Sequence, residues 1–113
     1  MIAGLKSFVN MEQTKYKTFK DLVFEPWAKR HGMELATRTG RHFHTQAVME
    51  FPNGYGVSVL HGDQFYSDEN TYEVAVMKDN KVVYPESICP DGDVLGWRTA
   101  EQVTEIMRKV QDL

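Results

Sequence analysis

The sequence contains few cysteines and no long apolar run, and each absence excludes a class of protein. Cys89 is the single cysteine among 113 residues, which excludes an internal disulfide and a zinc site built of thiolates. This usage is typical of a reducing compartment such as the cytoplasm. No apolar run approaches the ~20 residues that span a bilayer, and the first ten residues contain Lys6 and no cleavage site. We therefore expect neither a membrane span nor an export signal.

Proline and glycine are also few, at four and eight residues, and the chain shows no repeat or low-complexity tract. With 42% hydrophobic and 26% charged residues, the composition excludes collagen-like, coiled-coil and disordered chains. The length suits one domain. We expect residues 1–13 to form an N-terminal appendage, because Met11 is a second candidate start, and residues 14–113 to form a single α+β domain.

Charge is divided unevenly along the chain, although the net charge is only −3. Residues 1–46 contain eight Lys or Arg and four Asp or Glu, whereas residues 47–113 contain five and twelve. The asymmetry could steer a charged partner, or the basic segment could pack over the acidic part of the same domain. The pattern leaves both alternatives open.

Four runs rich in β-branched and aromatic residues, separated by turn residues, predict a four-stranded antiparallel meander. They span residues 43–51, 55–61, 71–77 and 81–84. Asp79 and Asn80 suit a two-residue hairpin, and residues 85–96 are predicted to be irregular. A helix is predicted from Thr99, which forms a capping box with Gln102, and its apolar stripe should pack on one sheet face. The stripe consists of Val103, Ile106, Met107, Val110 and Leu113.

An earlier helical segment is predicted to begin near Thr18, with Asp21 in its first turn. Pro26 interrupts the pattern, because proline removes a backbone donor from a helix. Two interpretations stay open: a short turn that ends near Phe24 followed by a new one at Pro26, or a kinked helix that ends at Gly32. The residues expected on the buried face are Phe19, Leu22, Val23 and Trp27.

The segment FPNGY at 51–55 decides how the first two strands pair. A two-residue turn at Asn53 and Gly54 would place the apolar residues of the two strands on opposite faces. A three-residue loop, with Pro52 and Asn53 in a type I turn and Gly54 in the left-handed conformation, brings them together. We adopt this register, since a slip by one residue would turn a strand over. Its opposed pairs are Phe51 with Tyr55, Met49 with Val57 and Ala47 with Val59.

The adopted register separates histidines that otherwise resemble a metal-binding set. His42 and His44 project on the face of Glu50, whereas His61 and Asp63 project on the other face. We therefore predict no metal site and no cofactor. A bulge in the first strand would restore the set, so a small metal-dependent enzyme stays as an alternative.

The remaining reactive residues do not assemble a catalytic site. Cys89 lies in a predicted loop, with neither a helix N-terminus nor an adjacent cation to lower its thiol pKa. The run DGD at 91–93 lacks the spaced ligands and closing glutamate of a calcium loop. We expect a protein that is not an enzyme.

The motif FPNGYGVSV at 51–59, with residues 18–22, 72–76, 94–96 and 101–104, resembles a family of short uncharacterised proteins encoded by bacteriophages and prophages. The resemblance extends from residue 18 to residue 113, whereas residues 1–13 and 27–44 depart from it. It implies a bacterial host cytoplasm and stoichiometric binding to a host or phage macromolecule. Inhibition of a bacterial defence system is one function of that kind.

Two surfaces are the predicted binding sites for a protein partner. One is a basic stretch made of Lys29, Arg30, Arg38, Arg41, His42 and His44. The other is the neighbouring aromatic pair Phe65 and Tyr66 in a polar loop, unless one ring folds back over the sheet edge. Nucleic acid, bound by the same basic stretch, is the alternative partner. A homodimer stays open, because an exposed edge strand could pair two chains.

If the basic stretch binds nucleic acid, Arg38→Ala and Arg41→Ala should each weaken binding, because each removes a cation that neutralises phosphate. Affinity of the unaltered protein for DNA or RNA should fall steeply as salt rises. Fluorescence anisotropy of a labelled oligonucleotide at several salt concentrations measures both effects. Absence of binding at low salt would exclude this alternative.

Overall fold

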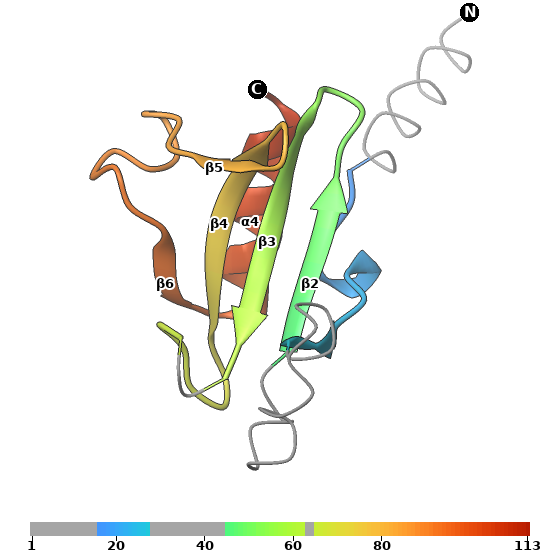
Figure 1. Cartoon of the computed structure of the whole chain (residues 1–113), viewed down its shortest axis with the longest axis vertical. Helices are drawn as coiled ribbons and strands as arrows, with labels where there is room; N and C mark the ends of the chain where they lie inside the picture. The colour runs from blue at the N-terminus through green and yellow to red at the C-terminus, as the bar shows by residue number, and fades with distance from the viewer. Residues whose placement is uncertain (1–15, 28–44, 63–64) are drawn as a thin grey trace, which may run out of the picture.

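The computed structural model describes residues 16–27, 45–62 and 65–113. Within them the chain forms an antiparallel sheet with an α-helix packed on one face, so the predicted α+β class is confirmed (Figure 1). The elements in chain order are η1 (Phe19–Asp21), β1 (Glu25–Pro26), β2 (Thr45–Glu50), β3 (Tyr55–His61), β4 (Tyr72–Lys78), β5 (Lys81–Val83), β6 (Leu95–Arg98) and α4 (Ala100–Gln111).

The sheet is larger than the predicted meander. Strands β2, β3, β4 and β5 correspond to the four predicted strands, but β1 pairs with β2 and β6 pairs with β4, which makes six. Strand β5 pairs with the end of β4 near Lys78, and β6 pairs with its start near Tyr72. Both short strands therefore lie along one edge of β4, one above the other in Figure 1.

The hairpin between β2 and β3 has the predicted three-residue loop. The amide of Phe51 donates to the carbonyl of Tyr55 at 2.7 Å, and the amide of Gly54 donates to the carbonyl of Phe51 at 3.0 Å. Gly54 has a φ of 89°, the left-handed conformation that glycine adopts without strain. The register pairs Ala47 with Val59 and Met49 with Val57, as predicted.

The hairpin between β4 and β5 is also confirmed. Asp79 and Asn80 have φ values of 54° and 63°, so both central residues are left-handed, as a type I′ turn requires. Asn and Asp tolerate this conformation better than other residues with a side chain. The pairs Lys78 with Lys81 and Val76 with Val83 follow from the turn.

Helix α4 has the predicted start and, with one exception, the predicted buried stripe. The hydroxyl of Thr99 accepts from the Gln102 amide at 3.2 Å, while the Gln102 side chain accepts from the Thr99 amide at 2.9 Å. Val103, Met107 and Val110 are fully buried and Ile106 nearly so, but Leu113 is 41% exposed because the helix ends before it. No helix in the described part of the chain is long and apolar enough to span a bilayer.

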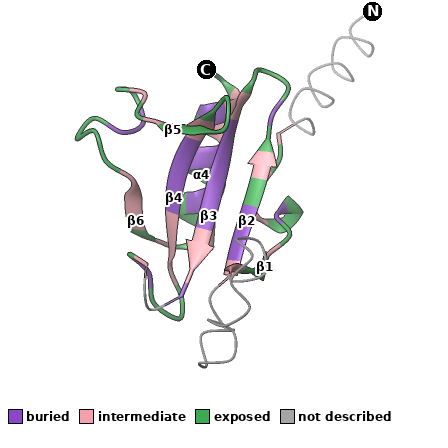
Figure 2. Ribbon diagram, in the orientation of Figure 1, coloured by how far each residue is buried: buried purple, intermediate pink, exposed green. Residues whose placement is uncertain are grey.

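The hydrophobic core lies between the sheet and α4. Its β-sheet side consists of alternate residues of β2, β3 and β4, and the middles of β3 and β4 are the most buried parts of the sheet (Figure 2). The hairpin loop is tied to the helix, since the Asn53 side chain donates to the carbonyl of Val110 at 2.9 Å. The sheet residues in the core include Ala47, Val57, Val59, Val74 and Val76.

Of the two interpretations of the segment from Thr18, the structure favours the short turn and rules out a continuous kinked helix. The 3-10 turn η1 forms, the chain then runs extended into β1, and Trp27 after Pro26 is helical. Leu22 is buried, Val23 is 72% exposed and Phe24 packs against the core, which is the two-residue alternation of an extended chain. The first turn is held to α4, because the Phe19 amide donates to the hydroxyl of Thr104 at 3.1 Å.

Strand β6 begins at the end of the segment 85–96, which is predicted to be irregular, and continues to Arg98. It contains a β-bulge, because the register against β4 shifts between Tyr72 and Val74. Trp97, in the bulge, has a φ of 57°, which is rare for a residue with a large side chain. The bulge breaks the two-residue alternation that identifies a strand in a sequence.

Replacing each glycine of the first hairpin by alanine should reveal two different kinds of strain, a steric clash at Gly56 and an unfavourable φ at Gly54. In Gly56→Ala the added carbon would lie 2.5 Å from the carbonyl oxygen of Met49, a backbone atom that cannot rotate away. We expect destabilisation of about 3 kcal/mol, the upper end for overpacking. In Gly54→Ala the carbon meets open space but φ stays left-handed, which should cost about 1 kcal/mol.

Urea unfolding of the two variants and the unaltered protein measures both values. An unchanged midpoint for Gly56→Ala would contradict the close approach of β2 to β3.

Candidate functional site

The two faces of the sheet differ in what covers them. The core residues of β2, β3 and β4 face α4, so the alternate residues of these strands face away from it. No helix or strand of the described chain packs over that second face, which we call the open face. Its residues include Val48 and Glu50 of β2, Gly56 of β3, Met77 of β4 and Val82 of β5.

Apolar side chains are exposed towards the two sides of the open face, whereas Ser58 and Ala75 in its middle are buried. Val48 is 48% exposed and Val82 is 42% exposed, and Met77 between them is partly buried. Three exposed aromatic residues follow or border the strands at the β5 and β6 edge: Tyr66, Tyr84 and Trp97. Apolar groups gathered on one surface of a packed domain are typical of an interaction site, whereas single exposed ones are ordinary.

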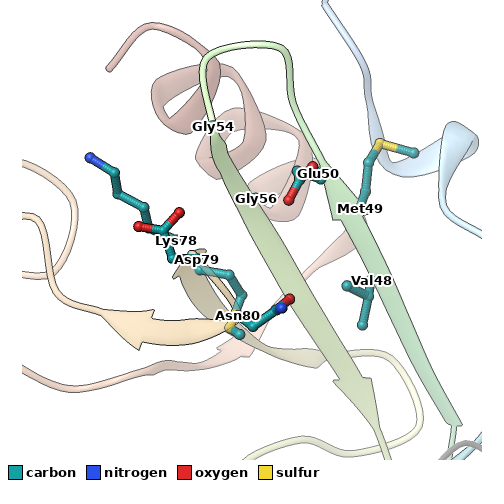
Figure 3. Close-up of a pocket in the computed structure, with 9 residues that line it drawn as sticks. Val48, Met49, Glu50, Gly54, Gly56, Lys78, Asp79 and Asn80 are labelled. Carbon is teal, nitrogen blue, oxygen red and sulfur yellow. The ribbon is translucent and has the colours of Figure 1, made fainter.

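Gly56 makes a hollow of about 40 Å³ in the open face. Figure 3 shows Val48 and Glu50 of β2 on one side of Gly56, and Asp79 and Asn80 of the β4–β5 turn on the other. Because Gly56 has no side chain, the side chains of its neighbours project from the sheet around it. A protruding side chain of a partner could enter such a hollow.

The open face is acidic as well as apolar. The carboxylate residues Glu50 and Asp79 line its hollow, and Glu73 lies on the same face of β4. None of the positions of β2, β3, β4 and β5 that face away from α4 holds Lys or Arg in the described chain. Lys78 borders the hollow, but its ammonium lies over the Tyr55 ring, 4.7 Å from the ring centre. The charge on this face therefore suits a basic partner.

The loop aromatics Phe65 and Tyr66 have different surroundings. The ring centres of Phe65 and Trp27 lie 6.0 Å apart, and Phe65 is partly buried. Phe65 is therefore the member of the pair that folds back against the rest of the protein. Tyr66 is 57% exposed, as predicted. Its backbone is held on both sides, because its amide donates to Glu73 at 3.0 Å and its carbonyl accepts from the Trp97 amide at 2.8 Å.

Trp97 is an exposed aromatic residue that the sequence prediction missed. It is 57% exposed, and its backbone bond to Tyr66 brings the two residues together at the β6 edge. Gly96 is required beside them, since an added carbon there would lie 2.6 Å from Cβ of Tyr66. A tryptophan outside every predicted helix or strand was the signal in the sequence.

The rest of the polar loop is held by short-range hydrogen bonds. The Ser67 hydroxyl donates to the carbonyl of Gly62 at 2.7 Å and accepts from the Gly62 amide at 3.0 Å. The hydroxyl of Thr71 donates to Asp68 at 2.8 Å. The hydrogen bond from the Asn70 amide, with that from Thr71, lowers the pKa of Asp68 below its usual value. These contacts present Tyr66 from an ordered turn.

The predicted basic stretch lies outside the described residues. It comprises Lys29, Arg30, Arg38, Arg41, His42 and His44. Its role in binding stays a prediction.

His61 projects towards the α4 side of the sheet, as the register predicts. It pairs with Thr45, its Nδ1 lies 3.1 Å from the carbonyl oxygen of Thr71, and its ring centre lies 4.8 Å from that of Tyr72. His42, His44 and Asp63, the other members of the set, are not among the described residues. Within residues 16–27, 45–62 and 65–113, no group of three or more His, Cys, Asp or Glu could hold a metal ion.

An aromatic hollow of about 440 Å³ lies beside His61. Phe19, Phe24 and Tyr72 line it, with ring centres of Phe19 and Tyr72 4.9 Å apart. These three rings pack against the core between η1 and β4. The described residues that line the hollow include one lysine, Lys20.

Cys89 is buried, with 3% of its surface exposed. Burial raises the pKa of its thiol above the ordinary value, and the charge of nearby Arg98 opposes that rise. A thiol that stays protonated and inaccessible is a poor nucleophile. The geometry around Cys89 is therefore that of a core residue.

Comparison of the chain with protein-family models, curated proteins and solved structures found no match. The candidate site is defined by its geometry alone.

The burial of Cys89 predicts slow reaction with Ellman's reagent in the folded protein. The rate should rise to that of a free cysteine in concentrated urea, because unfolding exposes the thiol and restores its ordinary pKa. Release of thionitrobenzoate, followed by absorbance with Cys89→Ala as the blank, measures both rates. Equal rates in buffer and in urea would show that the thiol is accessible in the fold.

Proposed function

We propose that this protein acts by stoichiometric binding to a protein partner, and that the open face is its binding surface. The proposal agrees with the class implied by the resemblance to short phage-encoded proteins, which includes inhibitors of bacterial defence systems. One observation carries it: exposed apolar side chains gather on a sheet face that no described element covers.

The chemistry of the face indicates the kind of partner. Val48, Met77 and Val82 offer apolar contact, which requires a partner with aliphatic or aromatic side chains. Glu50 and Asp79 border the same surface and favour Lys or Arg in that partner, since opposite charges speed association and exclude acidic competitors. The partner we propose is thus a polypeptide surface that is both apolar and basic.

The aromatic pair at the β6 edge extends this surface. Tyr66 and Trp97 are each 57% exposed, and both are residue types that contribute strongly to protein interfaces. The bonds that hold their backbones reduce the entropy lost when a partner orders them.

The same substitution at two places tests the proposal. Val48→Asp combined with Val82→Asp places two charges on the open face, whereas Val23→Asp alters a residue that is 72% exposed on the segment before β1. All three valines are exposed, so none of the changes should unfold the protein. Each variant and the unaltered protein serve as bait in bacterial lysate treated with nuclease, with bound proteins quantified by mass spectrometry.

We expect a protein that the unaltered chain and Val23→Asp retain equally, and that the double variant binds about tenfold less well. The purified partner should bind in a fixed ratio and more tightly at low salt. Equal retention by the double variant would contradict the assignment of the open face. Binding that is present in untreated lysate and lost after nuclease treatment would favour nucleic acid as the partner.

A further inference from the structure

A second hollow lies on the opposite side of the sheet from the open face, between β6 and α4. Its volume is about 200 Å³. Ile88, Leu95 and Ile106 form apolar walls, and Arg98 and Lys109 contribute cationic side chains. We call it the Arg98 hollow. Cavities that are mostly apolar with a few convergent polar groups are typical of small-molecule sites.

One donor nitrogen of Arg98 is buried and has no hydrogen-bond partner in the described chain. Its Nε is buried and forms no hydrogen bond, and no ion pair involves its guanidinium within residues 16–27, 45–62 and 65–113. Buried polar groups in native proteins are nearly always paired, so an unpaired guanidinium nitrogen calls for an explanation. A water molecule or an ion bound at the group is one of the recognised explanations.

Arg108 of α4 differs from Arg98, because its guanidinium donors are paired. Its Nη2 lies 2.5 Å from Glu105, its Nε donates to the same carboxylate at 3.2 Å, and its Nη1 donates to Asp112 at 3.1 Å. Two carboxylates thus neutralise Arg108.

Glu105 lines the Arg98 hollow, but its charge is engaged elsewhere. Its carboxylate accepts from Arg108, and this hydrogen bond lowers the pKa of Glu105 below its usual value. Arg98 and Lys109 therefore remain as cations without a carboxylate bonded to them in the described chain. The Gln102 side chain accepts from the Thr99 amide, which holds it at the rim of the hollow.

We propose that the Arg98 hollow binds a small ligand that carries an oxyanion, a carboxylate or phosphate group, beside a short apolar body. The planar guanidinium of Arg98 suits either group, because two parallel N–H donors match two oxygens. The ammonium of Lys109 adds a second positive charge at the rim, and the apolar walls accept an aliphatic or aromatic body. This site is independent of the open face.

Titration of the full chain with two probes tests the proposal. Isovalerate carries a carboxylate on a short apolar body, and inorganic phosphate carries only the oxyanion. At constant ionic strength, either probe should shift the backbone amide signals of Arg98 and Gln102 in a saturable way in ¹H–¹⁵N spectra. Binding of isovalerate alone would assign a carboxylate ligand, and binding of both would assign an oxyanion site in general.

Arg98→Gln keeps the polar character of the side chain but removes its charge, and should weaken binding about tenfold or more. Lys109→Gln, at an exposed position of α4, should fold normally and also weaken binding, so it decides the matter if Arg98→Gln fails to fold. Lys81→Gln, an exposed cation on β5, is the matched control and should bind like the unaltered protein.

No saturable shift with either probe would overturn the proposal. Equal affinity of the unaltered protein, Arg98→Gln and Lys109→Gln would overturn it as well. Neither result would bear on the open face, because that face is tested with a different partner and different residues.

Discussion

The pairing register of β2 and β3 is the constraint on which the rest of the structure depends. The left-handed Gly54 closes a three-residue loop, so Ala47 and Val59 face α4 together, while Val48 faces away with Glu50. A slip of one residue would exchange these sets and bury a carboxylate. The same register also determines which residues of β4 face α4, because β3 pairs with β4 along its length. One turn thus decides which side chains of these strands face α4 and which face away from it.

The position of α4 gives the two faces different chemistry. The helix covers one face with its apolar stripe, and its polar side, together with β6, lines the cationic Arg98 hollow. The other face keeps apolar and acidic groups without a helix over it in the described chain. The two candidate sites therefore have opposite charge and opposite location.

The elements that were predicted well are those whose cause is local. The hairpin at 79–80, the loop at 52–54 and the capping box of Thr99 each depend on a few adjacent residues with restricted conformations. The segment from Thr18 was predicted only in part, because the spacing of Phe19, Leu22, Val23 and Trp27 fits a helical face, whereas the chain between η1 and Trp27 is extended. Only the exposure of Val23 between two core side chains reveals the alternation. Strand β6 was not predicted, because the bulge at Trp97 interrupts the two-residue alternation by which a strand is identified in a sequence.

The sequence by itself determined the α+β class, the main hairpins, the final helix and the separation of His61 from Glu50, because these follow from turn chemistry and hydrophobic period. Of the candidate surfaces, it indicated Tyr66 but neither the open face nor Trp97 nor Arg98. Those depend on which segments meet: β6 reaches β4 across more than 20 residues of chain, and the Arg98 hollow forms only where Ile88 and Leu95 lie against α4. Whether a side chain is covered or paired in the folded protein depends on three-dimensional packing, and a local sequence pattern does not contain that information.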